Sequence, residues 1–192
     1  MGEGLLLHDQ RQHHRRGDTS VSQVSRTYRR QPVVIQFDDN RLQVAKRFGA
    51  TATVSAAGGK SAEAVMKMTG GRGVDTAIEA VGVPASFITC EDIVAPGGTI
   101  ANIGVHGVKV DLHLERLWAQ NITITTRLVD TVTTPMLLKT VQSRKIDPKQ
   151  LITHRFTLDR ILDAYDTFGR AASTQALRSL SKPETEMWVE HK

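Results

Sequence analysis

The sequence predicts an α/β fold built on a doubly wound parallel sheet, and three observations carry this prediction. Short apolar segments alternate with helical segments from residue 33 onward, which is typical of βαβ units. The segments 74–82 and 99–107 are apolar on both sides, as parallel strands buried on both faces are. Helix caps and glycine stops separate the segments. The 192 residues suffice for one domain with a core, with or without tails.

The first strand–helix pair lies just after residue 32. VVIQF (33–37) predicts a strand because it is rich in β-branched and aromatic residues. Asp38 and Asp39 offer the cap of the following helix, which Gly49 ends. TATV (51–54) predicts the next short strand.

The middle of the chain continues the alternation. A helix is expected at 61–70, a strand at 74–82, and a helix at 84–95 that begins with a proline. PGG at 96–98 is expected to form a turn that ends this helix and leads into the strand at 99–107.

The last third of the chain predicts a further strand and two longer helices. ITITTRLVD (122–130) alternates β-branched residues, as a strand does. Thr134 predicts the start of a helix, whose inward side is expected to carry Leu137, Leu138 and Val141. The other expected elements are an extended piece with a short helix at 108–120, an extended segment at 151–158, a helix at 159–168 with Ile161, Tyr165 and Phe168 on one side, and a strand at 174–180.

Residues 1–31 differ in composition from the rest of the chain. They carry six arginines and three acidic residues, a net +3 of the chain's +5. We interpret them as a solvated, poorly ordered basic arm. Contact with nucleic-acid phosphates is a less favoured alternative, because Tyr28 stands alone and base stacking needs interleaved aromatic residues.

A dinucleotide-binding sheet has a glycine-rich loop after its first strand, and the residues before 33–37 lack one. The glycines of GEG (2–4), GGRG (70–73) and PGG (96–98) do not stand between a strand and a helix, so we interpret them as turn glycines. The first strand of such a sheet stands at its centre, between the second and the fourth strands. If its slot were empty, these two strands would lie roughly 9–10 Å apart, and their facing backbone groups would be unpaired. Either the two halves of the sheet close up or another segment fills the slot, and LLLH (5–8) is the candidate, with a weak helix through Val21, Val24 and Tyr28 after it.

The segment upstream of Asp38 has the length of a first βα unit but lacks the glycine-rich loop of such a unit. We therefore hypothesise a change of reading frame near residue 32, with a genuine short form of the protein as the alternative. Translation of the other frames of the coding DNA tests this, since a glycine fingerprint should then appear upstream.

Ligands of doubly wound sheets lie outside the carboxyl ends of the strands. Gln36 stands where such sheets carry the acid that binds the adenosine ribose, and Arg41 lies about one helical turn further. The turns that follow the strands at 74–82 and 99–107 contain small residues, which let a ligand approach the backbone or simply permit a tight turn.

No catalytic or metal-ligating set is expected. Cys90 is the single cysteine, which excludes a disulfide framework and a cysteine-rich zinc site, and it is expected to be buried. His13 and His14 lack a partner at metal-ligand spacing. Local hydrogen bonds are expected for His106, His113 and His154. No apolar run reaches the roughly 20 residues of a membrane helix, so a cytoplasmic protein without a membrane partner is expected.

Two long strings of the sequence resemble the zinc-dependent medium-chain alcohol dehydrogenases. They are residues 77–107, from AIEAVG to IGVHG, and residues 121–168, which include IDPKQLITHRF (146–156), similar to the LDPxxLITHxF of that family. The resemblance covers roughly residues 33–180 and only the C-terminal half of such enzymes. It implies a Rossmann-like cofactor-binding domain at 32–180, which leaves the basic arm at 1–31 and a tail at 181–192 outside the domain.

The resemblance further implies binding of NAD or NADP, and it leaves the choice between them open. It assigns cofactor contacts to Gln36, Arg41, Val81, Gly82, Ile103, Gly104, Val105, Thr126, Arg127 and Leu128. Gln36 departs from the ribose-binding acid of the family, and Gln175 departs from a basic residue that contacts the pyrophosphate. Zinc is expected for the family, but its ligands belong to a separate N-terminal domain, so no catalytic or metal-binding residue carries over to this chain.

The sequence therefore predicts the cofactor-binding part of an alcohol dehydrogenase-like oxidoreductase, not competent for catalysis alone. The alternative is a non-catalytic interaction module derived from such an enzyme. The edge strand ITITTRL (122–128) would then join copies into a homo-oligomer.

Overall fold

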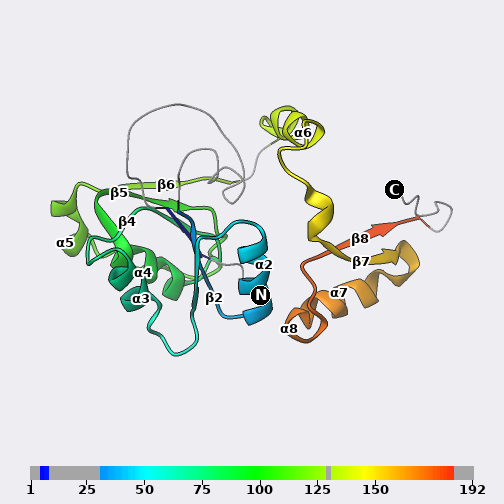
Figure 1. Ribbon diagram of the computed structural model, residues 1–192, viewed down its shortest axis with the longest axis horizontal. Helices are drawn as coiled ribbons and strands as arrows, with labels where there is room; N and C mark the ends of the chain where they lie inside the picture. Colours follow the sequence, from blue (N-terminus) through cyan, green and yellow to red (C-terminus); the bar gives the residue numbers. More distant parts are fainter. Residues whose placement is uncertain (1–4, 9–30, 129–130, 184–192) are drawn as a thin grey trace. The chain divides into compact units, whose positions relative to one another are not determined.

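The computed structural model describes residues 5–8, 31–128 and 131–183 (Figure 1). The chain divides into two compact units, Met1–Thr140 and Val141–Lys192.

Several expectations fall outside the described residues. They concern most of the basic arm, with His13, His14 and the weak helix through Val21, Val24 and Tyr28, and most of the tail at 181–192. The extent of one cofactor-binding domain over 32–180 stays a prediction.

Six strands form the sheet of the first unit in the order β3-β2-β1-β4-β5-β6 (Figure 1). In chain order they are β1 (Leu5–His8), β2 (Val33–Gln36), β3 (Ala52–Ser55), β4 (Val74–Glu79), β5 (Val94–Asn102) and β6 (Thr123–Thr126). β2 pairs in parallel with β3, and β5 pairs in parallel with both β4 and β6. This is the strand order of a doubly wound dinucleotide-binding sheet, with LLLH in the slot of the first strand, as the sequence predicts.

β1 occupies that slot in reverse, antiparallel to both of its neighbours. Leu6 pairs with Val34 of β2 on one side and with Ile78 of β4 on the other. Because β2 and β4 both oppose β1, they run in the same direction, so the five parallel strands end at one edge of the sheet. β1 ends toward the opposite edge, where His8 pairs with Thr76.

Helices follow the strands of the first unit, and the last of them crosses the boundary between the two units. They are α2 (Asp39–Arg47), α3 (Ser61–Met68), α4 (Pro84–Ile93), α5 (Leu114–Leu117) with a 3-10 turn at Trp118–Gln120, and α6 (Thr134–Gln142). Asp38 caps α2 as predicted, since its Oδ1 accepts hydrogen bonds from the backbone N–H groups of Asn40 (2.8 Å) and Arg41 (3.2 Å). α3 and α4 pack against each other and against the sheet. The core between them includes Ile35, Val54, Val65, Ala77, Phe87, Cys90, Ile93 and Ile100.

The boundary between α4 and β5 differs from the prediction. The helix expected at 84–95 ends at Ile93, and β5 begins at Val94, so the expected turn at 96–98 lies within the strand. Val94 pairs with Val74, whereas the next paired residue, Thr99, meets Thr76. The extra residues of β5 form a bulge, and a proline and glycines are tolerated at such a site.

Two leucines of α6 also differ from the prediction. Leu137 and Leu138 are 46% and 55% exposed and do not face inward, whereas Thr140 is buried. No other described element packs extensively against α6.

The second unit contains a parallel pair of strands, β7 (Ile152–Thr157) and β8 (Arg178–Lys182), packed against α7 (Ile161–Gly169). Smaller elements complete it, namely the 3-10 turns Pro148–Leu151 and Leu158–Arg160 and the helix α8 (Ala171–Thr174). Among the helices of the described ranges, none has the length and apolar character needed to cross a membrane.

Candidate functional site

The sequence-predicted site residues of the first unit lie along the edge where the five parallel strands end. Gln36 is the last residue of β2, Val81 and Gly82 follow β4, and residues 103–105 follow β5. Thr126 ends β6 and precedes Arg127 and Leu128. Because parallel strands end at a common edge, this is the place where doubly wound sheets bind their ligands.

Gln36 and Arg41 lie at the β2 end of this edge. Gln36 is 5% exposed, and its Oε1 accepts a hydrogen bond from the backbone N–H of Phe37 at 2.8 Å. Arg41 stands in the first turn of α2, half-buried, with its backbone N–H on the Asp38 carboxylate. The last residue of β2 is therefore an uncharged amide, partly engaged with its own backbone.

The turns after β4 and β5 lie directly against each other. A Cβ atom at Gly82 (φ +84°) would overlap the carbonyl of Val105, and one at Gly104 would overlap the backbone nitrogen of Gly82 and Oε2 of Glu79. Glycine is therefore needed at both positions for this close approach of backbones.

Apolar side chains project from the β5 and β6 ends of the edge. Ile103 is 55% exposed, Val105 is 76% exposed, and Leu128 is exposed as well. The β6 end joins the β5 end, because Asn102 pairs with Thr126 and its carbonyl accepts a hydrogen bond from Arg127 N at 3.2 Å. Exposed apolar groups beside these turns suit the flat face of an aromatic ligand.

The structure does not bring every predicted residue together. β1 separates β2 from β4, so the end of β2 stands roughly 9–10 Å from the end of β4. Gln175 belongs to the second unit, where it has a left-handed backbone (φ 57°) after α8.

Sequence reasoning missed Glu79, the last residue of β4. Its side chain is fully buried, and its Oε1 accepts hydrogen bonds from Val81 N (2.9 Å), Gly82 N (2.9 Å) and the Ser86 hydroxyl (2.5 Å). The signal that could have found it is a carboxylate at the end of the apolar stretch Ala77–Ile78, since a buried carboxylate needs partners.

His106 and His154 make local hydrogen bonds, as expected, whereas the partner of His113 is distant in sequence. His106 Nε2 lies 2.8 Å from Asn102 Oδ1, and His154 Nδ1 lies 2.9 Å from the Thr153 hydroxyl. His113 binds the buried carboxylate of Glu91 through its ring and its backbone N–H.

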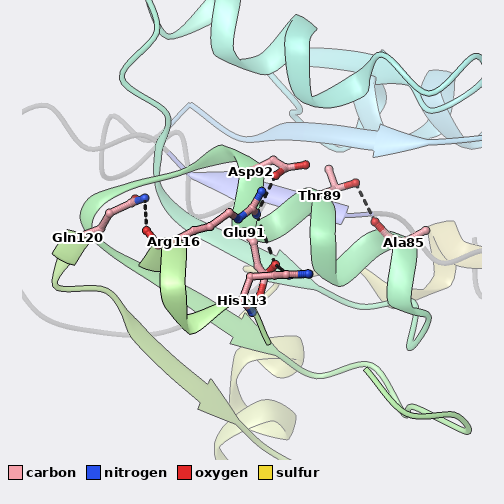
Figure 2. A network of polar contacts seen from close by, with 7 residues as sticks. All are labelled: Ala85, Thr89, Glu91, Asp92, His113, Arg116 and Gln120. Carbon is pink, nitrogen blue, oxygen red and sulfur yellow. Dashed lines mark hydrogen bonds and ion pairs between the residues drawn. The ribbon is translucent and has the colours of Figure 1, made fainter. Parts of the chain in front are cut away.

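Figure 2 shows how Glu91 joins α4 to the segment around α5. Arg116 extends this network, with its guanidinium 3.0 Å from Asp92 Oδ1 and 3.5 Å from Glu91 Oε2. Cys90, next to Glu91, is fully buried as predicted. Burial, followed by the charges of Glu79 and Glu91, raises the pKa of its thiol far above the ordinary 9.0. Cys90 is therefore an inert core residue and not a nucleophile.

The residues of the edge fit a dinucleotide only in part. The uncharged end of β2 and the two interlocked turns leave backbone and apolar surface for a ribose and a nicotinamide ring. The pyrophosphate needs a glycine-rich loop that leads from the first strand into a helix at this edge. β1 instead ends toward the opposite edge, so the described residues do not form that cradle. They also contain no group of three histidine, cysteine or acidic side chains that could hold a metal ion.

Comparisons with known proteins identify the relatives of the chain. The sequence model of the family described as zinc-binding dehydrogenase matches residues 21–144. An alcohol dehydrogenase of Cupriavidus necator is 32% identical over 144 residues, which are 71% of this chain and 38% of the relative. The chain thus spans less than half the length of such relatives.

Solved structures give the same result. The zinc-dependent alcohol dehydrogenase 2 of Streptococcus pneumonia, in its apo form, has a TM-score of 0.75 and 46% identity, and the match covers 81% of this chain and 45% of that one. A zinc-binding dehydrogenase of Sinorhizobium meliloti bound to NADP has a TM-score of 0.70 at 23% identity, covering 79% and 44%, and supports the fold. The sequence model, the relatives and the fold agree, and the chain belongs to the zinc-binding dehydrogenase family.

Proposed function

We propose that this chain is the NAD(P)-binding part of an alcohol dehydrogenase-like oxidoreductase and does not catalyse hydride transfer alone. The observation that carries the proposal is the common edge of the five parallel strands, where the turns after β4 and β5 interlock. Family membership supports the cofactor class.

Each predicted residue has a role in this proposal. Gln36 and Arg41 would bind the adenosine ribose, and Val81 with Gly82 would flank the adenine. The nicotinamide ring would lie on the turn from Ile103 to Val105. Backbone groups of Thr126, Arg127 and Leu128 would bind its carboxamide. The cofactor supplies the hydride chemistry, and the chain supplies position.

Two features argue that the chain alone is incompetent. Without a cradle for the pyrophosphate among the described residues, much of the usual affinity for the dinucleotide is lost. Alcohol oxidation in this family also needs a metal that stabilises the alkoxide, and the described residues provide no ligand set for one. The metal site and substrate pocket would have to come from residues other than those described.

The end of β2 bears on the choice of cofactor. A carboxylate there would repel the 2′-phosphate of NADP, and Gln36 has no charge. We therefore expect NAD and NADP to bind with similar affinity, within about threefold, a difference worth less than about 1 kcal/mol.

Titration of the full chain with NADH and NADPH, followed by nicotinamide fluorescence, tests the proposal. Saturable, weak binding of both cofactors is expected, with no change on adding zinc and no oxidation of ethanol. Gln36→Asp should weaken NADPH binding at least tenfold and leave NADH binding within threefold. Absence of binding, or turnover of ethanol by the purified chain, would refute the proposal.

One observation favours a second function, assembly of copies through a sheet edge. β6 is the outer strand of the sheet, and Thr123, Thr125 and Thr126 are exposed on it. An unpaired strand edge is a template for another strand. Size-exclusion chromatography with light scattering distinguishes the functions, since a strict monomer at high concentration excludes assembly, and Thr125→Pro should dissociate a dimer formed through β6.

A further inference from the structure

Both turns of the candidate site depend on Glu79. Its side-chain Oε1 holds the backbone N–H groups of Val81 and Gly82, while its backbone carbonyl accepts hydrogen bonds from Ile103 N (2.8 Å) and Gly104 N (3.1 Å). One residue therefore positions the turn after β4 with its side chain and the turn after β5 with its main chain.

The second oxygen of this carboxylate has an unusual environment. Glu79 Oε2 is buried and accepts no hydrogen bond from any described residue. Gly104 lies so close that a Cβ atom there would overlap it. His106 Nε2 lies 3.2 Å from this oxygen. A buried carboxylate oxygen is costly without such a neighbour.

The orientation of His106 follows from its other contacts. Asn102 Nδ2 donates to the carbonyl of Gly104 at 3.2 Å, so Asn102 Oδ1 is the acceptor that faces His106 Nε2 at 2.8 Å. Nε2 must then carry a hydrogen, because an acceptor needs a donor opposite it. The ring is also held edge-on by Phe87 of α4, with the ring centroids 6.2 Å apart.

We propose that His106 is a positioning residue of the candidate site, whose Nε2–H lies between Asn102 and Glu79 and fixes the turn after β5 against the turn after β4. The proposal rests on the proposed function, since these two turns are the surfaces on which the nicotinamide and adenine ends of the cofactor would lie. The Asn102 side chain also bridges the turn from Asn102 to His106. Its Nδ2 donates to the Gly104 carbonyl, and its Oδ1 faces His106 Nε2.

Loss of the Nε2–H has a specific consequence. Asn102 Oδ1 would lose its donor, Glu79 Oε2 would lose its polar neighbour, and the turn at 103–105 would open more often. The turn after β4 keeps its own hydrogen bonds to Glu79 Oε1, and so does the Ser86 hydroxyl of α4. The sheet itself should therefore remain folded.

The first measurement needs no variant and no cofactor. In the full chain, long-range 15N–1H NMR spectra of the histidine rings at neutral pH should show a hydrogen on Nε2 of His106. A ring protonated only at Nδ1 would overturn the proposal, whether or not the chain binds a cofactor.

The second measurement compares three variants by amide hydrogen exchange. His106→Leu should speed exchange at Ile103 and Gly104 at least tenfold, whereas His106→Gln, which keeps a donor near the Nε2 position, should stay within threefold of the unsubstituted chain. His154→Ala, on β7 in the second unit, is the control and should leave both amides unchanged. Equal exchange in the Leu and Gln variants would contradict a positioning role.

Cofactor titration links the inference to the site. His106→Leu should raise the Kd for NADH at least fivefold, and His106→Gln should restore it to within twofold. If the unsubstituted chain binds no cofactor, the proposed function is refuted while the NMR and exchange results still decide the role of His106. If the chain binds cofactor and His106→Leu binds equally well, His106 does not position the site.

Discussion

The carboxylate of Glu91, fully buried in α4, holds His113 by two hydrogen bonds, from the backbone N–H at 3.1 Å and from the ring Nδ1 at 2.6 Å (Figure 2). The two residues lie far apart in sequence, so the contact fixes the segment before α5 against α4. That segment leads from the β5 turn of the candidate site to β6.

Glu91→Ala should therefore destabilise the chain. It leaves the backbone N–H and ring of His113 without their acceptor, which costs about 1.5–3 kcal/mol for a hydrogen bond to a charged group. Urea unfolding followed by circular dichroism measures the effect. Asp92→Ala is the control, because its exposed ion pair with Arg116 should contribute less than about 1 kcal/mol. Equal losses of unfolding free energy in the two variants would show that the Glu91–His113 contact stabilises the fold no more than the exposed ion pair does.

Gly82→Ala should be more harmful than substitution of another glycine with the same backbone conformation. Gly82 and Gly59 both have positive φ, which costs an alanine roughly 1–2 kcal/mol. Only Gly82 would also place its Cβ against the carbonyl of Val105, whereas Gly59 faces open space. The difference in unfolding free energy between the two alanine variants measures the close approach of the turns, and no difference would mean that they do not interlock.

Leu6→Pro should disrupt the centre of the sheet. Leu6 pairs with Val34 and Ile78, and a proline in a central strand removes a ladder hydrogen bond and leaves a buried acceptor unsatisfied, at a cost of about 1–3 kcal/mol. Leu6→Val keeps the strand and serves as the control. If the proline variant unfolds at the same urea concentration as the unsubstituted chain, residues 5–8 do not complete the sheet in solution.

The thiol of Cys90 should make stability fall at alkaline pH. The thiol of the unfolded chain ionises near 9.0, while burial, Glu79 and Glu91 raise the pKa of the folded thiol well above that value. Above pH 9 the folded state therefore binds more protons than the unfolded state, and the free energy of unfolding falls by about 1.4 kcal/mol per pH unit.

Cys90→Ala removes this contribution. Unfolding free energies of the two chains between pH 8 and pH 10.5 should diverge in slope only above pH 9, because other alkaline groups titrate alike in both. Parallel pH profiles would show that the thiol ionises in the folded chain. A thiol reagent at pH 8 should likewise label Cys90 only after unfolding.

The sequence predicted only those parts of the candidate site that are turns at the ends of strands. The turns at Val81–Gly82 and 103–105 follow apolar segments whose ends are read from local pattern, and the structure brings these turns together. Glu79 and His106 escaped, because their importance arises from contacts between β4, β5 and α4 that no local pattern records.

Errors at element boundaries and faces have related causes. The helix expected at 84–95 stops at Ile93 because pairing with β4 recruits Val94 into a strand, a long-range effect that overrides helical spacing. Leu137 and Leu138 have helical spacing suited to a core, but spacing does not say whether a core is present beside them.

The sequence by itself determined the α/β class and most of the strands and helices, with LLLH as a candidate for the first strand, because apolar runs, caps and turn residues act within a few residues of themselves. Only the tertiary structure decided the direction of β1 and the burial of Glu79 between two turns. A short apolar strand can pair in either direction, since its hydrogen-bonding groups belong to the backbone. Its reversal takes the end of the first strand away from the edge where the other five strands end.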